Sequence, residues 1–215
     1  MSSQAPYGDP QTRDRILAAT QALVAERGSK LKLSDVADRA GVSRQAVYLH
    51  FGDRTGLLVA LVQHMDETLA LGASLAQLFQ AETGADVIAR TMALHGRFSA
   101  STDPIASILE AAQYDDEALG AAWRDRMHFR HQVHQRIVQR IAELGELAPD
   151  WPADAAADLL YALTLPGPWR ELTRELGWTQ SQYVDAMSSL LGKALLAPTS
   201  PQLAPKTAQR KRREK

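Results

Sequence analysis

The side chains best suited to chemistry crowd into one short segment, Val36 to Arg54, which reads VADRAGVSRQAVYLHFGDR. Arginine can donate to a guanine edge, glutamine can pair with an adenine edge, and an alanine methyl can contact the methyl of thymine. Serine, tyrosine, histidine and arginine suit phosphate oxygens, which fix the position of a protein on DNA rather than its sequence preference. This mixture predicts a surface for double-stranded DNA.

The candidate DNA contacts fall into two groups. Arg44, Gln45 and Ala46 are the candidates for base edges, although Arg44 and Gln45 could each face phosphate or solvent instead. The other polar side chains suit phosphate, and Leu49 carries little information. The full set is Ser34, Ser43, Arg44, Gln45, Ala46, Tyr48, His50 and Arg54.

Two short helices joined by a tight turn would present this surface. Gly41 can adopt the left-handed conformation that ends the first of them, and Ser43 can cap the second. A turn of about three residues is typical of a helix-turn-helix. An amphipathic run precedes the pair, with Thr12 able to cap its start and Gly28 its end. The predicted helices span residues 10–28, 34–40 and 44–50.

The order of these motifs resembles the DNA-binding domain of TetR-family transcriptional regulators. TRDRILAATQALVAERG is followed by LSDVADRAGVSRQAVYLHFGDRTGLL, so the ERG helix end, the AGVS turn, the VYLHF block and the DR-x-x-LL helix start occur in the family's order. The match runs from Thr12 to Leu58, and a weaker similarity covers ADLLYALTLPGPWRELTRELGWTQSQYVDAM. Lys32 departs from the family pattern, which often has a capping threonine there, and Ser29 replaces a common aromatic residue.

The resemblance implies an all-α protein in which a three-helix helix-turn-helix domain, residues 1–52, precedes a larger helical ligand-binding and dimerisation domain, residues 53–197. We expect about nine helices. It also implies a homodimeric repressor that an unknown small-molecule effector releases from a palindromic operator. A ligand-independent regulator or an activator with the same DNA-binding unit is the alternative, and the sequence does not separate the two.

Helical periodicity continues through the larger part of the chain. A long helix is predicted from Asp53, its N-cap, to the break before Gly84. Pro104 is expected in the first turn of a new helix. Another long helix, begun by the acidic residues around Asp116, should end near Gly145.

Aromatic, methionine and histidine side chains recur in the larger part and suggest an apolar pocket between helices. The resemblance is the main reason to expect a pocket, and core packing is the alternative for each residue. Trp123, Met127 and His131 stand out because spacings of four residues place them near one helix face. The candidate pocket residues are His95, Phe98, Tyr114, Trp123, Met127, His131, Tyr161 and Trp169.

Three histidines, His128, His131 and His134, invite a metal-binding interpretation. Spacings of three residues spread them over about 120° of helix surface, so that three-way ligation is awkward. We therefore predict no metal and no cofactor, and interpret this stretch, with Arg124 and Arg130, as a solvated basic face. Arg136 belongs to the same interpretation.

The last helix carries more apolar surface than an isolated surface helix needs. The resemblance implies that it forms part of a dimer interface, whereas packing inside one chain is the alternative. The candidate interface residues are Tyr183, Met187, Leu190, Leu191 and Ala194. The basic tail, residues 198–215, is expected to be disordered, and contact of this tail with DNA is left open.

Composition excludes several classes of protein. The chain of 215 residues contains no cysteine, which rules out disulfides and thiolate chemistry. Residues 1–60 are slightly basic and the middle is acidic, so a polyanion should meet the N-terminal part. No apolar run reaches the roughly 20 residues of a membrane span, and no secretory signal is recognisable. We expect a cytoplasmic protein that is not an enzyme, because no catalytic motif is present.

Overall fold

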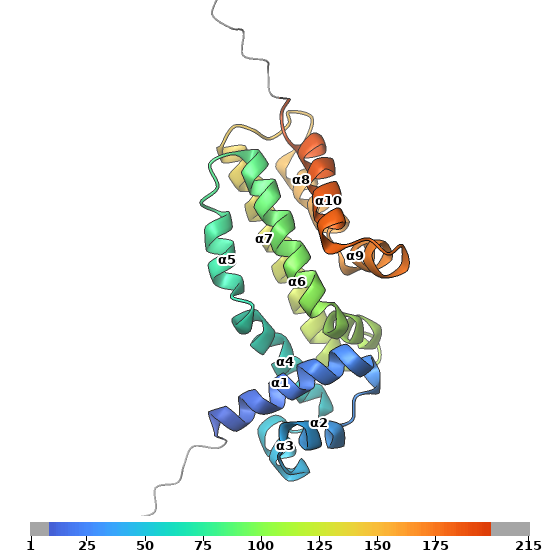
Figure 1. The fold of residues 1–215 in the computed structure, drawn as a ribbon. Coiled ribbons are helices and arrows are strands. Elements are labelled where there is room, and N and C mark those ends of the chain that lie inside the picture. Colours follow the sequence, from blue (N-terminus) through green and yellow to red (C-terminus); the bar gives the residue numbers. More distant parts are fainter. Residues whose placement is uncertain (1–8, 199–215) are drawn as a thin grey trace, which may run out of the picture.

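The fold is a set of α-helices arranged along two long central ones (Figure 1). A computed structural model describes residues 9–198, which form ten α-helices and no strand. This confirms the all-α prediction. The predicted disordered tail, residues 198–215, lies outside the described residues apart from Pro198.

The first three helices form a compact helix-turn-helix unit: α1 (Pro10–Arg27), α2 (Leu33–Ala40) and α3 (Arg44–Phe51). Gly41 has a left-handed φ of 65°, and the Ser43 hydroxyl accepts a hydrogen bond of 3.1 Å from the Ala46 amide, so both predicted turn roles are confirmed. The predicted cap at Thr12 is wrong. Asp9 caps α1 instead, because its carboxylate lies ahead of a proline that favours the first helical position.

Helix α4 (Arg54–Thr68) leads from this unit to the rest of the molecule (Figure 1). Asp53 caps it as predicted, accepting a hydrogen bond of 2.7 Å from the Gly56 amide. The expected single long helix is wrong, because Ala70 adopts a left-handed φ of 51° and ends that run. Helix α5 (Leu71–Leu78) starts afresh there and brings Leu78 into the core.

The two central helices are α6 (Gly84–Ala112) and α7 (Glu117–Glu143), which pack against each other. Pro104 lies inside α6 rather than at the start of a new helix. Proline has no N–H, so α6 loses one backbone hydrogen bond at this point. Burial of Ile105 and Ile108 just after the proline stabilises the helix and offsets that loss of free energy. Asp116 caps α7 as expected, accepting from two backbone amides at 3.0 Å.

The C-terminal part comprises α8 (Ala153–Leu163), α9 (Pro166–Arg170) with a π-helical turn (Glu171–Glu175), and α10 (Gln180–Leu195). Helix α8 packs on α7, and α10 packs on α6. A core of buried side chains from α8, α10 and both central helices holds these elements together.

A separate core joins the helix-turn-helix unit to the central helices. It contains buried side chains of α1 to α4 together with Ile105 and Leu109 of α6 and Trp123 of α7. The proposed boundary at residue 52 thus separates two units that share one apolar core.

Replacing Gly41 with alanine should lower the free energy of unfolding by about 1–2 kcal/mol, because a Cβ is strained in the left-handed conformation. Gly72→Ala is the matched control. Gly72 is exposed inside α5, where alanine should stabilise by up to about 1 kcal/mol. Urea unfolding of both variants measures the difference, and a Gly41→Ala variant as stable as the parent would contradict this account of the turn.

Candidate functional site

Helix α3 is mostly exposed and is anchored to the rest of the unit on its inner side. Val47 is the buried residue of this helix, and it packs into the first core. Arg44 and Gln45 are exposed, and Tyr48 is 53% exposed, so these three predicted contacts lie on an open face. Whether they contact DNA stays a prediction.

The remaining predicted DNA contacts are partly buried or already form hydrogen bonds within the protein. Ser43 uses its hydroxyl to cap α3, while Ser34, Ala46 and His50 are half-buried. One nitrogen of the Arg54 guanidinium donates to the Ser29 carbonyl at 3.0 Å, so only its other N–H groups could reach a phosphate.

Leu49 is 63% exposed on α3 and was missed as a candidate. It follows Gln45 by four residues, so that the two side chains share the outer face of the helix. That spacing was readable from the sequence. An exposed leucine there could contact the methyl group of thymine.

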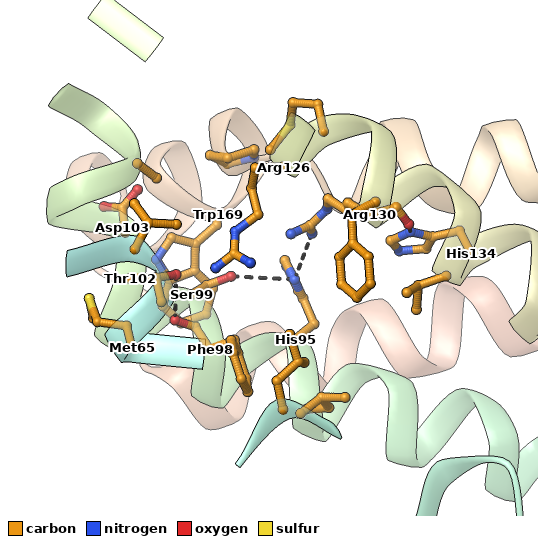
Figure 2. A pocket seen from close by; sticks show the side chains of 18 of the residues that line it. Met65, His95, Phe98, Ser99, Thr102, Asp103, Arg126, Arg130, His134 and Trp169 are labelled. Atoms are coloured by element: carbon orange, nitrogen blue, oxygen red, sulfur yellow. Dashed lines mark hydrogen bonds between the residues drawn. The ribbon is translucent and has the colours of Figure 1, made fainter. Parts of the chain in front are cut away.

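A cavity of about 140 Å³ lies within the larger part of the molecule (Figure 2). Its walls come from α4, α5, α6, α7 and α9, and they are mostly apolar. The apolar side chains that line it include Val62, Met65, Leu71, Leu75, Leu78, Phe98, Trp123, Met127, Phe129 and Trp169. For comparison, an engineered apolar cavity of about 150 Å³ holds benzene.

Five of the eight predicted pocket residues line this cavity: His95, Phe98, Trp123, Met127 and Trp169. Their contact with a ligand remains a prediction.

Three predicted pocket residues lie elsewhere. Tyr114 is 90% exposed in the turn between α6 and α7. His131 pairs with Asp158 of α8 at 2.8 Å and packs against the Tyr161 ring, with ring centres 5.0 Å apart. Eight helical residues turn the chain by about 80° beyond two full turns, so His131 leaves the face that Trp123 occupies.

Arg130 lines the cavity, and its interpretation as part of a solvated face was wrong. It follows Trp123 by seven residues, a net rotation of only about 20°, so a helical wheel could have found it. Arg124 is exposed as expected, and the Arg136 guanidinium lies 4.6 Å from the centre of the Phe79 ring. Arg130 is half-buried, because part of its side chain is open to the cavity. The surrounding protein nevertheless lowers the pKa of the guanidinium to about 10 through desolvation.

Arg130 and His95 form the polar centre of the cavity (Figure 2). Arg130 Nη2 donates to His95 Nδ1 at 2.9 Å, and the Ser99 hydroxyl lies 3.3 Å from the same nitrogen. Since a guanidinium can only donate, His95 carries its proton on Nε2, which lies 3.0 Å from the Tyr183 hydroxyl. Burial, and then the charge of Arg130, place the pKa of His95 well below its usual value, so the ring is neutral.

His134 sits one turn beyond Arg130 and is also buried. Its Nδ1 donates to the Arg130 carbonyl at 2.6 Å, and its Nε2 lies 3.0 Å from the Thr164 hydroxyl. Burial lowers the pKa of His134 to about 3. The ring is thus neutral and joins α7 to the end of α8.

The three histidines of α7 have different surroundings. His128 is exposed beside Gln132, His131 pairs with Asp158, and His134 is buried. Residues 9–198 contain no cluster of three or more histidine and carboxylate side chains suited to a metal ion.

Two polar contacts join α4 to α7. Arg126 donates to both oxygens of Asp66 at 2.5 and 2.6 Å, and the Thr55 hydroxyl donates to Asp116 at 2.7 Å. Because Arg126, Val62 and Met65 also line the cavity, the helix that follows the helix-turn-helix unit forms part of the cavity wall.

At another point of the cavity wall, a carboxylate is buried. Asp103 is 3% exposed and faces two arginines, with Arg170 Nε at 3.5 Å and Arg174 also in contact. Burial raises the pKa of Asp103, and the two arginines oppose that rise. Both positive groups near this carboxylate belong to the segment around α9.

The predicted dimer-interface residues divide between the two faces of α10. Tyr183, Met187 and Leu191 are buried in the core of the chain, so their assignment to an interface is wrong. The face of α10 that carries these three residues packs on α6 of the same chain. Leu190 is 49% exposed and Ala194 half-buried, and both remain candidates.

Within the described residues, no helix combines the length and the apolar character needed to cross a membrane.

Residues 16–61 match the family model described as "Bacterial regulatory proteins, tetR family". The chain is 30% identical over 168 residues to the HTH-type transcriptional repressor Rv3405c of Mycobacterium tuberculosis, a match that covers 77% of this chain and 75% of that protein.

Solved structures share the fold. A protein of Saccharomonospora viridis, named as a transcriptional regulator and solved in complex with choline, has a TM-score of 0.73 at 19% identity, covering 88% of this chain and all of that one. SmeT, the repressor of a multidrug efflux pump of Stenotrophomonas maltophilia, solved with triclosan, has a TM-score of 0.70 at 21% identity over 95% of this chain and all of that one.

Acidification should destabilise the folded chain through the buried rings of His95 and His134. Both have folded-state pKa values below the usual 6.5, so the unfolded chain binds protons that the folded chain excludes. The contribution of the two neutral rings to stability is fully present above about pH 6.5. Below that pH, the free energy of unfolding should fall by about 1.4 kcal/mol per pH unit for each ring as the pH drops toward 5.

Urea unfolding between pH 7 and 5 measures this slope. His134→Gln should remove part of it, whereas His128→Gln, at an exposed position of the same helix, should leave it nearly intact. Equal slopes in the parent and in His134→Gln would show that the buried ring does not exclude protons.

Proposed function

The chain belongs to the TetR family of DNA-binding transcriptional regulators, and on that premise we propose that it is a homodimeric repressor released from a palindromic operator by a small molecule. The family consists of regulators and not enzymes, in agreement with the prediction from the sequence.

The exposed face of α3 carries the DNA-binding part of the proposal. Ser43 and Gly41 fix the ends of the turn, and Val47 holds the helix from inside. Arg44, Gln45 and Tyr48 are then presented outward on a helix short enough to enter the major groove. Arg44 and Gln45 suit base edges, and Tyr48 suits a phosphate.

A homodimer is supported by the reading geometry of such a helix. One short helix contacts only a few base pairs, so two copies related by a two-fold axis double the recognised site. Candidate interface residues are Leu190 and Ala194 of α10, together with Leu176 and Trp178, which are exposed just before this helix. The similarity to the M. tuberculosis relative, which is named as a transcriptional repressor, supports the repressor assignment.

Release of DNA by a ligand requires that cavity and α3 be mechanically connected. Helix α4 provides the connection, because Val62 and Met65 line the cavity while Leu57 and Leu58 are buried in the core shared with the helix-turn-helix unit. The Asp66–Arg126 and Thr55–Asp116 contacts attach α4 to α7. A ligand must bind the DNA-incompetent arrangement more tightly, since equal affinity shifts no equilibrium.

Selection of bound sequences from a random DNA pool at moderate salt tests the DNA-binding face. We expect a two-fold symmetric motif. Arg44→Ala should lose preference at one position in each half-site, and Tyr48→Ala should weaken binding about ten-fold or more for all sequences. Arg124→Ala, at an exposed position of α7, should retain both the motif and the affinity.

Enrichment of no motif by the parent protein would contradict specific DNA recognition in this state. A reporter gene carrying the selected motif then separates the two modes of regulation. Lower expression in the presence of the protein supports a repressor, and higher expression supports the activator alternative.

A charge at Leu190 should disrupt the proposed dimer. Leu190→Glu places a carboxylate on the outer face of α10 without disturbing the core, because the leucine is already half-exposed. Sedimentation should show a monomer at concentrations where the parent is a dimer, with loss of binding to the two-fold motif. Tyr114→Glu, in the exposed turn after α6, should remain dimeric. Dimers of equal stability in the parent and in Leu190→Glu would exclude this face.

A further inference from the structure

Arg130 is a cationic side chain at the cavity for which the described residues supply no counter-charge. Its Nη2 donates to His95 Nδ1 and to the Thr164 carbonyl, both neutral acceptors. Its Nε is buried without a hydrogen-bond partner. Within residues 9–198, no carboxylate forms an ion pair with this guanidinium.

The other charged groups along the cavity wall are paired. Arg126 is held by both oxygens of Asp66, and Asp103 lies between Arg170 and Arg174. Arg170 also contacts Glu110. The cavity therefore contains one positive charge in excess, located at Arg130.

The neighbouring histidines do not supply the missing charge. His95 is neutral, and it uses Nδ1 as the acceptor for Arg130 and Nε2 as the donor toward Tyr183. His134 is neutral as well, and contacts Arg130 through the backbone carbonyl. A half-buried guanidinium whose donors meet only neutral acceptors is stabilised further by an opposite charge with good geometry, because neutral dipoles replace its hydration only in part.

The rest of the wall selects the body of the ligand. Leu75, Phe98 and Trp123 present apolar surface along the same cavity that Arg130 lines. Figure 2 shows Phe98 and Arg130 in this cavity. A volume of about 140 Å³ fits one small ring or a short branched chain. The geometry combines a single fixed cation with an apolar enclosure.

We propose that this cavity binds a small amphipathic carboxylic acid, whose carboxylate pairs with Arg130 and whose aromatic or short aliphatic body packs against Leu75, Phe98 and Trp123. The proposal rests on the proposed function, because it names the chemical class of the effector. A planar guanidinium accommodates a carboxylate with two parallel hydrogen bonds, which makes the pair both strong and directional. An amine of the same size would meet the charge of Arg130 and be repelled.

Matched probes at pH 7.5 test the charge requirement. Benzoate, phenylacetate and hexanoate are compared with their amides and with benzylamine, using calorimetry and the fluorescence of Trp123 and Trp169 in the cavity wall. At least one of the acids should bind ten-fold or more tightly than its amide, and benzylamine should not bind.

Variants of the arginine identify the partner of the acid. Arg130→Met should remove the preference for acid over amide, and Arg130→Lys, which keeps the charge but loses the fork of donors, should retain part of it. Arg124→Met, at an exposed position on α7, should bind as the parent does. Circular dichroism and binding of the amides check that each variant is folded.

Three results would overturn the proposal. They are equal affinity for acid and amide, a preference for acid that survives in Arg130→Met, and failure of all three acids to bind to a protein that still recognises its DNA motif.

Release of the selected DNA motif separates this proposal from the proposed function. An acid that binds through Arg130 yet leaves DNA bound supports the carboxylate site and contradicts ligand-controlled release. Release by an amide or an amine supports the regulator and overturns the acid class. Thr55→Val should still bind the acid but show a smaller change in DNA affinity, because it removes the hydrogen bond that attaches α4 to Asp116 at the start of α7.

Discussion

The structure depends on one apolar core that the helix-turn-helix unit shares with α4, α6 and α7. Met65 of α4 and Trp123 of α7 are buried in that core, and both also line the cavity. Close-packed interiors transmit small displacements instead of absorbing them, because there is little free volume. The cavity and the helix that positions α3 therefore share wall and core residues, which is the physical basis of the proposed release of DNA by a ligand.

The polar interior of the cavity is arranged around neutral groups. Two buried histidines, held in defined tautomers by Arg130, its carbonyl and Thr164, connect α6, α7 and the end of α8. Their protonation is opposed by burial and by the adjacent guanidinium. Among residues 9–198, the same arrangement gives Arg130 only neutral partners, and this feature carries the proposed preference for a negatively charged ligand.

Helix α10 packs one face into the core of the chain and leaves the opposite face exposed. Tyr183 and Leu191 are fully buried within the chain, and Tyr183 also receives the hydrogen bond of His95. Leu190, on the outer face, is open to solvent. A dimer formed through the outer face would therefore stand one helix away from the polar centre of the cavity.

Local chemistry made the helix-turn-helix predictable from the sequence. Gly41, Ser43 and Asp53 act through their own backbone conformation or through amides three residues away, so a single chain segment contains the whole interaction. The sequence also determined that the fold is all-α and that Trp123 and Met127 would share a face. Tertiary structure decided what that face meets.

Spacing alone could not place Tyr114 outside the cavity or Tyr183 inside the core, because helical periodicity specifies an apolar face but not its partner. Likewise, Arg130 and Arg124 are chemically identical in the sequence. Their positions on the helical wheel put them on different faces of α7, but only the packing of distant helices brings His95 of α6 against Arg130 and leaves Arg124 in solvent.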